Sequence, residues 1–358
     1  RRLGGGGRSA RFLWGAGLAR MRGLIGTERM FGRVDRRVTG SLTVGVDIGG
    51  TNLRAAVVDA DGKILDIEKL PTPSNVHALE AALVHAVGCL QRRNEGIGAV
   101  GLAVAGFINS QRDTVRFAPH LPWRNTKVTQ RLSTRLGLPV ELEHDANSAA
   151  LGEYHLGAAQ GAGTWVLFAL GTGIGGAVMV DGEIYRGAFG TAPEFGHLTV
   201  MPGGRACPCG KQGCLERYCS GSALALTAQD LIATGEFPDS AITREFAQHP
   251  EEISGRAVVR LAREGDQLAR AAVEDMGLWL GRGLSLVQDV LDPELIVIGG
   301  GVSADADLFL VQAESMLNYD IVGAGHRPVA RVKTAQLGGD AGMIGVALLA
   351  RKHLGSAA

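Results

Sequence analysis

The fold class is decided by residues 42–65, LTVGVDIGGTNLRAAVVDADGKIL. The apolar run that ends in Asp47 predicts a strand, the glycines after it a tight bend, and the apolar runs on either side of the DG dipeptide two further strands. The same plan returns in residues 164–185, TWVLFALGTGIGGAVMVDGEIY, although few residues are identical. The sequence therefore predicts an α/β protein whose two lobes repeat one construction.

Each lobe contains one glycine-rich bend between its first two strands. Without a Cβ atom, backbone N–H groups in such a bend can approach phosphate oxygens. Either bend alone fits an ordinary hairpin turn better, but the pair indicates two bends that grip one nucleotide. The first bend leads into a strand and the chain has no G-x-x-x-x-G-K-[ST], so this is neither a Rossmann fingerprint nor a P-loop. The glycines with this role are Gly49, Gly50, Gly171 and Gly173.

The rest of the chain alternates helical and strand patterns. Helical periodicity covers residues 74–94, residues 253–291 and residues 337–354, and the last of these is expected to return to the first lobe. Residues 97–106, IGAVGLAVAG, predict a buried strand. Another strand, in ELIVIGGGVS, opens onto Gly299 and Gly300, which either admit a flat adenine close to the backbone or form a strand-to-helix turn with positive φ.

Composition limits the partners. The chain has 358 residues, enough for two domains, and 36 basic residues balance 36 acidic ones. No field of one sign attracts nucleic acid or an anionic membrane, and no apolar run reaches the roughly 20 residues that span a bilayer. Five cysteines are too few for a disulfide scaffold in a chain of this size. We therefore expect a cytoplasmic protein with a small-molecule substrate.

Residues 1–41 are rich in arginine and glycine and almost free of acidic residues. This composition superficially resembles a transit peptide. Met21 and Met30 offer later starts, however, so the segment is interpreted as a flexible leader with a mis-assigned start rather than as a targeting signal.

The sequence CPCGKQGC predicts a metal site. Cys207, Cys209 and Cys214 offer three thiolates, and His197 offers a nitrogen ten residues before the first of them. This tetrahedral set of three sulfur atoms and one nitrogen is one that zinc prefers. Four protein ligands leave no position for water, so the zinc is expected to be structural. Reduced cysteines in a plain loop are the alternative.

Six motifs occur in one order: VDIGGTNLRAAVVD, EHDANSAALGE, ALGTGIGGAVM, PEFGHLTV, CPCGKQGCLE and IVIGGGVS. Together they resemble the ROK family of bacterial sugar kinases and sugar-responsive repressors, from residue 42 to the end of the chain. The resemblance implies an actin-like, ribonuclease-H-like pair of α/β domains that bind ATP and sugar in the cleft between them. The N-terminal lobe would comprise residues 42–143 and 339–358. The C-terminal lobe would comprise residues 144–338, with the zinc loop at residues 194–216.

The kinase branch of this family fits better than the repressor branch. Repressors of the family carry a winged helix-turn-helix domain before the first phosphate bend. Residues 1–41 are short and glycine-rich, with no recognition-helix pattern or basic stripe. We therefore expect no nucleic-acid partner.

The resemblance implies that Asp145 is the catalytic base. Phosphoryl transfer to a sugar hydroxyl needs an acceptor for the hydroxyl proton, and a carboxylate can serve. The alternative role for Asp145 is to cap the helix that follows it. The resemblance also implies that Asp47 holds a magnesium ion through water, although a plain turn residue at the end of a strand is possible there. Side-chain contacts with phosphate are expected from Thr51, Asn52 and Thr172.

On the sugar side, the resemblance implies that Glu194, His197 and Glu216 contact hydroxyl groups, with His197 bridging metal and ligand. A loop stapled by zinc would hold both glutamates rigidly. Considered alone, each glutamate fits a solvated surface role as well. Gly106, at the end of the strand 97–106, is assigned to the same pocket.

Two sugar-side positions depart from the usual family pattern. His144 precedes Asp145 where asparagine is usual, and His120 stands in RFAPHLPWRN where many glucokinases of the family have asparagine. Imidazole lacks the donor and acceptor fork of an amide, so the hydroxyl pattern that is recognised is open. The predicted activity is ATP-dependent phosphorylation of the 6-hydroxyl of a hexose, with glucose first. N-acetylmannosamine or N-acetylglucosamine is the alternative substrate, and a catalytically silent sugar-binding regulator is the alternative function. The resemblance also implies a homodimer or homotetramer.

Overall fold

The computed structural model describes residues 42–354. The predicted leader, residues 1–41, lies outside the described residues, as do residues 355–358.

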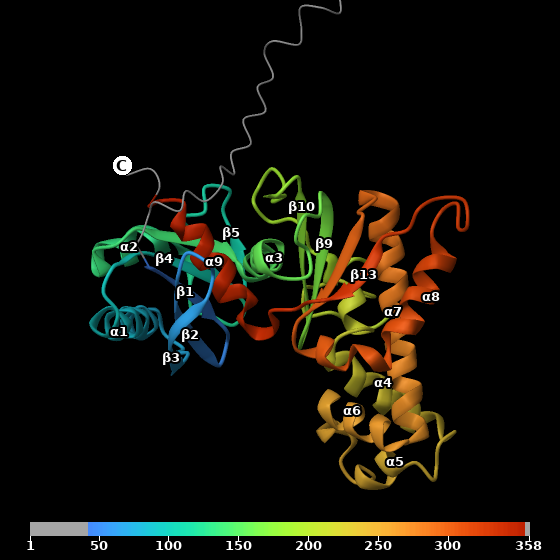
Figure 1. The fold of residues 1–358 in the computed structure, drawn as a ribbon. Helices are drawn as coiled ribbons and strands as arrows, with labels where there is room; N and C mark the ends of the chain where they lie inside the picture. The colour runs from blue at the N-terminus through green and yellow to red at the C-terminus, as the bar shows by residue number, and fades with distance from the viewer. Residues whose placement is uncertain (1–41, 355–358) are drawn as a thin grey trace, which may run out of the picture. The chain divides into compact units, whose positions relative to one another are not determined.

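The first half of this region forms a five-stranded sheet in the order β3-β2-β1-β4-β8 (Figure 1). Strands β1, β2 and β3 are an antiparallel meander, and β4 and β8 continue from β1 in parallel. Parallel strands end at one edge, so Asp47 in β1 and His144 in β8 lie at the same edge, with β4 between them. The strands are β1 (Leu42–Ile48), β2 (Asn52–Val58), β3 (Ile64–Pro71), β4 (Ile97–Val104) and β8 (Val140–His144).

The second sheet repeats this connectivity in the order β11-β10-β9-β12-β13. Its first three strands are again an antiparallel meander, and β12 and β13 again continue in parallel. The repeated construction predicted from the sequence is therefore confirmed. The strands are β9 (Thr164–Leu170), β10 (Ile174–Val180), β11 (Glu183–Ile184), β12 (Leu295–Gly299) and β13 (Arg331–Thr334).

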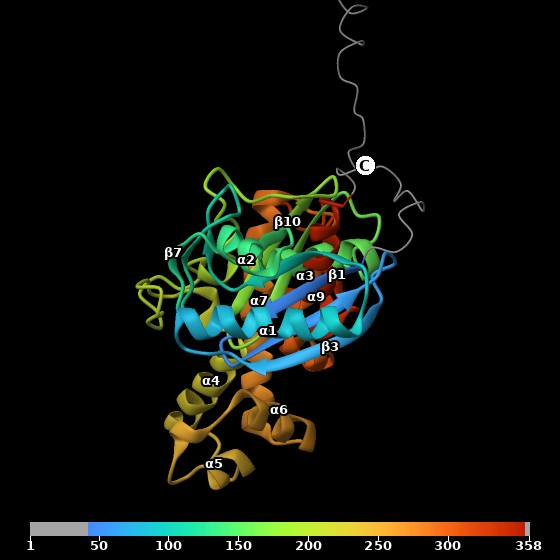
Figure 2. The ribbon, with the colours of Figure 1, turned by 90° about the vertical axis from the view of Figure 1, so that its left-hand side faces the viewer.

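Helices cover both faces of the first sheet. Helix α1 (Val76–Arg93) and helix α2 (Val128–Leu136) pack on one face, and Figure 2 shows α1 in front of the strands. Helix α9 (Ala341–Arg351) packs on β1 and β4. This approach is close because a Cβ atom at Gly45 would collide with the carbonyl group of Met343.

Helix α3 (Asp145–Leu156) packs on α9 and on β10. The largest core cluster lies under the helices of the second half, where the predicted helical region 253–291 contains α6 and α7, separated at Gly265. These helices are α4 (Gly221–Thr234), α5 (Ala241–Glu245), α6 (Gly255–Glu264), α7 (Gln267–Leu291) and α8 (Leu310–Asp320). The boundaries assigned to the two lobes stay a prediction.

The smaller elements form a three-stranded sheet and five short 3-10 helices. The strands are β5 (Phe107–Ile108), β6 (Val115–Phe117) and β7 (Arg124–Thr126). The 3-10 helices are η1 (Phe195–His197), η2 (Leu215–Arg217), η3 (Pro250–Glu252), η4 (Gly301–Leu308) and η5 (Gly338–Asp340). Within residues 42–354, no helix has the length and apolar character needed to cross a membrane.

Candidate active site

Two carboxylates, those of Asp47 and Asp145, lie at the carboxyl edge of the first sheet, and their negative charges repel each other. Asp47 lies at the end of β1, and Asp145 follows β8 directly. Burial and then the charge of Asp145 raise the pKa of Asp47 from 3.8 to about 6, and the charge of Arg54 opposes this rise. A carboxylate that is buried and repelled in this way gains from a bound cation.

Asp145 is the first residue of α3 rather than its cap. The cap position belongs to His144, whose side chain makes no capping hydrogen bond. The Asp145 carboxylate accepts only the adjacent Ala146 N–H, at 2.8 Å, and lies 3.2 Å from Nε2 of His144. The capping alternative is therefore wrong, because the helix begins one residue earlier than it requires.

Arg54 was missed by the sequence analysis. It pairs with Asp47 across the β1–β2 ladder, donates to the carbonyl oxygen of Gly339 at 2.9 Å and forms a 2.5 Å ion pair with Asp340. It is the only charged residue in β2, NLRAAVV, and this was the available signal. Arg54 thus connects the edge that carries Asp47 to the turn before α9.

One backbone N–H group of the first bend makes a hydrogen bond within the bend. The Gly49 N–H donates to the carbonyl oxygen of Asn52 at 3.0 Å, and the Thr72 side chain holds the Gly49 carbonyl at 2.7 Å. The Gly49 N–H is therefore engaged within the turn itself, and a role for Gly49 at the phosphate stays a prediction. The Gly50 N–H has no acceptor among the described residues, and exposed Thr51 and Asn52 follow it.

His120 lies beside this bend. A Cβ atom at Gly50 would stand 3.0 Å from the Cβ of His120. A side chain assigned to the sugar is thus in contact with the first phosphate bend. No hydrogen bond or ion pair among residues 42–354 links the first bend directly to the second.

The second bend follows the same rule. The Gly171 N–H donates to the carbonyl oxygen of Gly173 at 2.9 Å, while Thr172 is exposed at the tip. A role for Gly171 at the phosphate stays a prediction. The next N–H, of Ile174, donates to Oε2 of Glu216 at 2.9 Å. A Cβ atom at Gly173 would collide with the same carboxylate. A residue assigned to the sugar therefore also supports the second bend.

Two further backbone segments pack against the second bend. The N–H of Gly221, at the start of α4, donates to the Gly171 carbonyl oxygen at 2.8 Å. Gly300 has a φ of 79°, and a Cβ atom there would collide with the carbonyl group of Leu170. The turn interpretation therefore accounts for Gly300 without a ligand, whereas Gly299 lies at the end of β12, paired with Ala169. Gly221 was not found from the sequence, because its contact is with a segment 50 residues away.

The carboxyl group of Glu194 is influenced by the charges of four other side chains of the site. Burial raises the pKa of its carboxyl group; the negative charges of Asp145 and Glu216 add to this rise, while His144 and His197 oppose it. These five side chains therefore act on one region. Glu194 is nevertheless open to solvent, as a group that accepts hydrogen bonds from a ligand must be.

Gly106 lies where the neighbouring backbone leaves no room for a side chain. A Cβ atom there would lie 2.7 Å from the carbonyl oxygen of Phe117 and 2.8 Å from the Cβ of Ala118. Close packing therefore explains why residue 106 is a glycine, and the role of Gly106 in the sugar pocket stays a prediction.

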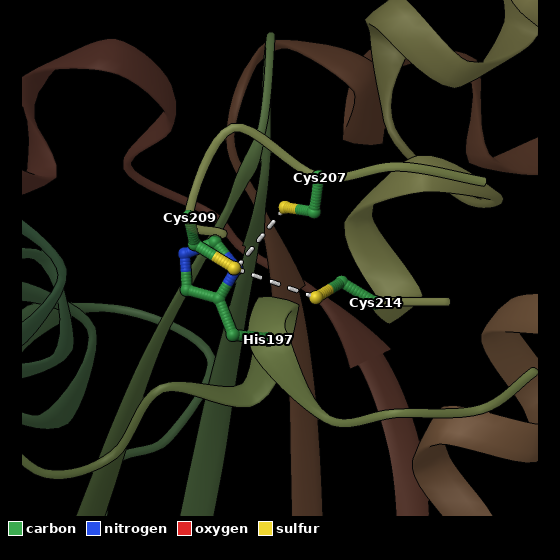
Figure 3. Close-up of side chains that lie close together, drawn as sticks. All are labelled: His197, Cys207, Cys209 and Cys214. Carbon is green, nitrogen blue, oxygen red and sulfur yellow. Dashed lines mark hydrogen bonds between the residues drawn. The ribbon is translucent and has the colours of Figure 1, made fainter. Parts of the chain in front are cut away.

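Three thiols and one imidazole converge in the loop that carries Glu194 and Glu216 (Figure 3). Nδ1 of His197 lies 3.7 Å from the sulfur of Cys207, the sulfur atoms of Cys209 and Cys214 lie 3.6 Å apart, and one ligand atom from each residue lies within 4.8 Å of the others. Zinc–sulfur bonds of about 2.3 Å in a tetrahedron would place neighbouring sulfur atoms about 3.8 Å apart. The cluster therefore fits a tetrahedral metal.

The chemistry of the donor set points the same way. All five cysteines are free thiols. Burial and the neighbouring thiols raise the pKa of Cys214 to about 12, so thiolates here need a cation among them. Both ends of the loop meet at Ile174: Gly196 packs against its carbonyl group, and Glu216 accepts its N–H.

The comparisons with known proteins agree on one family. The ROK family model matches residues 43–353. Glucokinase of Streptomyces coelicolor is 41% identical over 312 residues, which cover 87% of this chain and 98% of that protein. The crystal structure of a ROK family glucokinase from Streptomyces griseus in complex with glucose and AMPPNP is 40% identical, with a TM-score of 0.77 over 87% of this chain and 100% of that one. The ROK hexokinase of Thermus thermophilus is 33% identical, with a TM-score of 0.72 over 88% and 99%. These structures confirm the predicted ROK sugar kinase fold.

Proposed function

This chain belongs to the ROK family, and we propose that it is an ATP-dependent kinase that phosphorylates the 6-hydroxyl group of glucose. The observation that carries the proposal is geometric. The Asp145 carboxylate lies at the carboxyl edge of the first sheet, 3.2 Å from Nε2 of His144, and the loop that carries Glu194, His197 and Glu216 is held against the second bend at Ile174. Its support from relatives is the 41% identical glucokinase and the 40% identical structure that holds glucose and AMPPNP.

In the proposed reaction, Asp145 accepts the proton of the attacking hydroxyl group while Glu194 and Glu216 orient the sugar ring. The Asp145 carboxylate makes its single hydrogen bond to Ala146, so lone pairs remain for the substrate proton. Asp47 would hold a hydrated magnesium ion, which screens the charge of the triphosphate when bound.

The nucleotide would lie along both bends. Gly50 has a free N–H, and the side chains of Thr51, Asn52 and Thr172 stand exposed on the bends. Gly299 ends β12 and Gly300 follows it, at the same edge of the sheet as the second bend. We assign the adenine to Gly299 and Gly300. The positive φ of Gly300 is a second reason for glycine at that position.

We assign a structural zinc ion to His197, Cys207, Cys209 and Cys214. It would hold the loop that ends in Glu216, and the coordinated imidazole would keep one nitrogen for a sugar hydroxyl. The cytoplasmic location, the absence of a nucleic-acid partner and the homodimer or homotetramer stay predictions.

A panel of hexoses tests the proposed function. ADP release would be measured with ATP and glucose, mannose, N-acetylmannosamine and N-acetylglucosamine, and binding of each sugar by calorimetry. We expect kcat/KM for glucose to exceed that for both N-acetyl sugars by at least about 100-fold, because a pocket fitted around a 2-hydroxyl group has no room for an acetamido group.

The opposite order would replace glucose by an amino sugar and leave the kinase assignment in place. Sugar binding without ADP release from any sugar would instead indicate a silent regulator.

A further inference from the structure

Glu143 is a buried carboxylate directly before His144 and Asp145. It is 2% exposed, near the end of β8. Its Oε1 accepts the His144 N–H at 3.0 Å and the Asn147 side-chain amide at 2.9 Å. These donors flank Asp145 in the chain. One oxygen of Glu143 therefore holds the turn that presents the proposed base.

The other oxygen binds a different part of the chain. Oε2 of Glu143 accepts from Nε of Arg186 at 3.0 Å and from Nη2 at 2.5 Å, so two N–H groups of one guanidinium fork converge on a single carboxylate oxygen. Arg186 lies two residues after the end of β11, and its carbonyl oxygen accepts the Ala192 N–H at 3.1 Å. The segment that it anchors leads two residues later to Glu194.

Stability alone is a weak reason for such an arrangement. A buried ion pair is often no more stabilising than apolar side chains of the same volume, because desolvation offsets the attraction. Here burial raises the pKa of Glu143, but the charge and hydrogen bonds of Arg186, with the donors from Asn147 and His144, bring it below its ordinary value. The carboxylate thus stays ionised and keeps both sets of contacts at neutral pH.

We propose that Glu143 is a positioning residue that fixes Asp145 relative to Glu194 by binding the catalytic turn with one oxygen and the sugar-side segment with the other. This inference rests on the proposed function. A reacting group that moves by about 1 Å can cost roughly 100-fold in rate, so a rigid link between base and sugar ligand has a direct kinetic value. Arg112, 3.6 Å from Oε2, supplies a second positive charge but no fork.

The chain offers a matched control in Glu80. It is also 2% exposed and is also paired with two arginines, Arg131 at 2.8 Å and Arg135 at 3.3 Å, but it joins α1 to α2. Glu80→Gln therefore removes a buried ionised carboxylate of the same kind from a place that has no role in the proposed reaction.

The test uses Glu143→Gln, Arg186→Lys and Glu80→Gln, with melting temperature, glucose affinity by calorimetry, and kcat and KM for both substrates. We expect the first two variants to lower kcat by at least about 10-fold and to weaken glucose binding by about 5-fold or more, with KM for ATP within about 2-fold. Glu80→Gln should lower the melting temperature while its kinetic constants stay within about 2-fold of wild type.

Arg186→Lys keeps the charge and loses the fork, so it answers the question even if Glu143→Gln fails to fold. Arg186→Gln combined with Glu143→Gln should lose less activity than the product of the two single losses, since both substitutions break the contact between Glu143 and Arg186. Wild-type kinetics in Arg186→Lys, or equal losses for glucose and ATP, would overturn the positioning role. A wild-type enzyme that releases no ADP with any hexose would overturn the proposed function instead.

Discussion

At the scale of single residues, the proposed chemistry depends most on Asp145. Replacing it by asparagine preserves the shape of the side chain and removes its ability to accept a proton. We expect Asp145→Asn to lower kcat by at least about 100-fold while much of the glucose affinity remains. Steady-state kinetics and calorimetry measure the two effects. If the variant turned over at more than about a tenth of the wild-type rate, another group would have to be the base.

Asp47 is expected to serve the reaction but to lower the stability of the ligand-free protein at neutral pH. Its folded-state pKa, about 6, lies above the ordinary 3.8, so folding favours the protonated form. The resulting stabilisation is complete below the unfolded-state pKa and is lost as the pH rises through about 6. Ionised Asp47 thus destabilises the ligand-free protein at neutral and alkaline pH.

Asp47→Asn should therefore stabilise the ligand-free protein by about 1–3 kcal/mol at pH 8 and abolish most of the turnover, a common conflict at functional sites. The gain should shrink as the pH falls toward 4. Urea unfolding of both proteins at pH 8 and pH 4.5 provides the comparison. A variant that is no more stable than wild type at pH 8 would show that burial of Asp47 is not costly.

At the scale of elements, the loop from Glu194 to Glu216 has little regular structure besides η1 and η2. Backbone hydrogen bonds, such as those from Val200 to Gly213 and from Cys207 to Lys211, fold the loop back on itself, and the proposed zinc ion would add a cross-link between η1 and residues 207–214. We expect about one zinc ion per chain by elemental analysis, and loss of the ion should cost several kcal/mol of folding free energy, as structural zinc commonly does.

Cys209→Ser should remove the zinc, lower the melting temperature and weaken glucose binding. Cys89→Ser is the control, since Cys89 lies in α1 and outside the cluster. Zinc-free protein with full activity and an unchanged melting temperature would remove the structural role.

At the scale of the whole molecule, α9 links the two sheets, because it packs on β1 and β4 and also on α3, which contacts β10. The contact between α3 and α9 depends on glycine. A Cβ atom at Gly345 would collide with the carbonyl group of Ser148, whereas a Cβ atom at Gly342, on the same helix, would meet nothing within 4 Å.

Gly345→Ala should therefore destabilise the protein by about 2 kcal/mol or more, because backbone must move to admit the methyl group. Gly342→Ala should be neutral or stabilise it by up to about 1 kcal/mol, since alanine favours the helix. Urea unfolding of both variants measures the difference. Equal stabilities would mean that α3 and α9 adjust to each other freely.

The sequence by itself determined the features that depend on near neighbours. The repeated meander follows from strand periodicity and turn residues within residues 42–65 and 164–185, and the metal-ligand set lies within residues 197–214. Patterns of this kind can be read from a single sequence because the residues that form them lie close together in the chain.

The hydrogen bonds of individual groups, by contrast, became known from the three-dimensional structure. It showed that the N–H groups of Gly49 and Gly171 are consumed by their own turns. It also joined Arg54 to Asp340, 286 residues away, and Glu143 to Arg186, 43 residues away. Such pairs depend on strand register and on the packing of distant segments, and a contact between distant residues leaves no periodic trace in a single sequence.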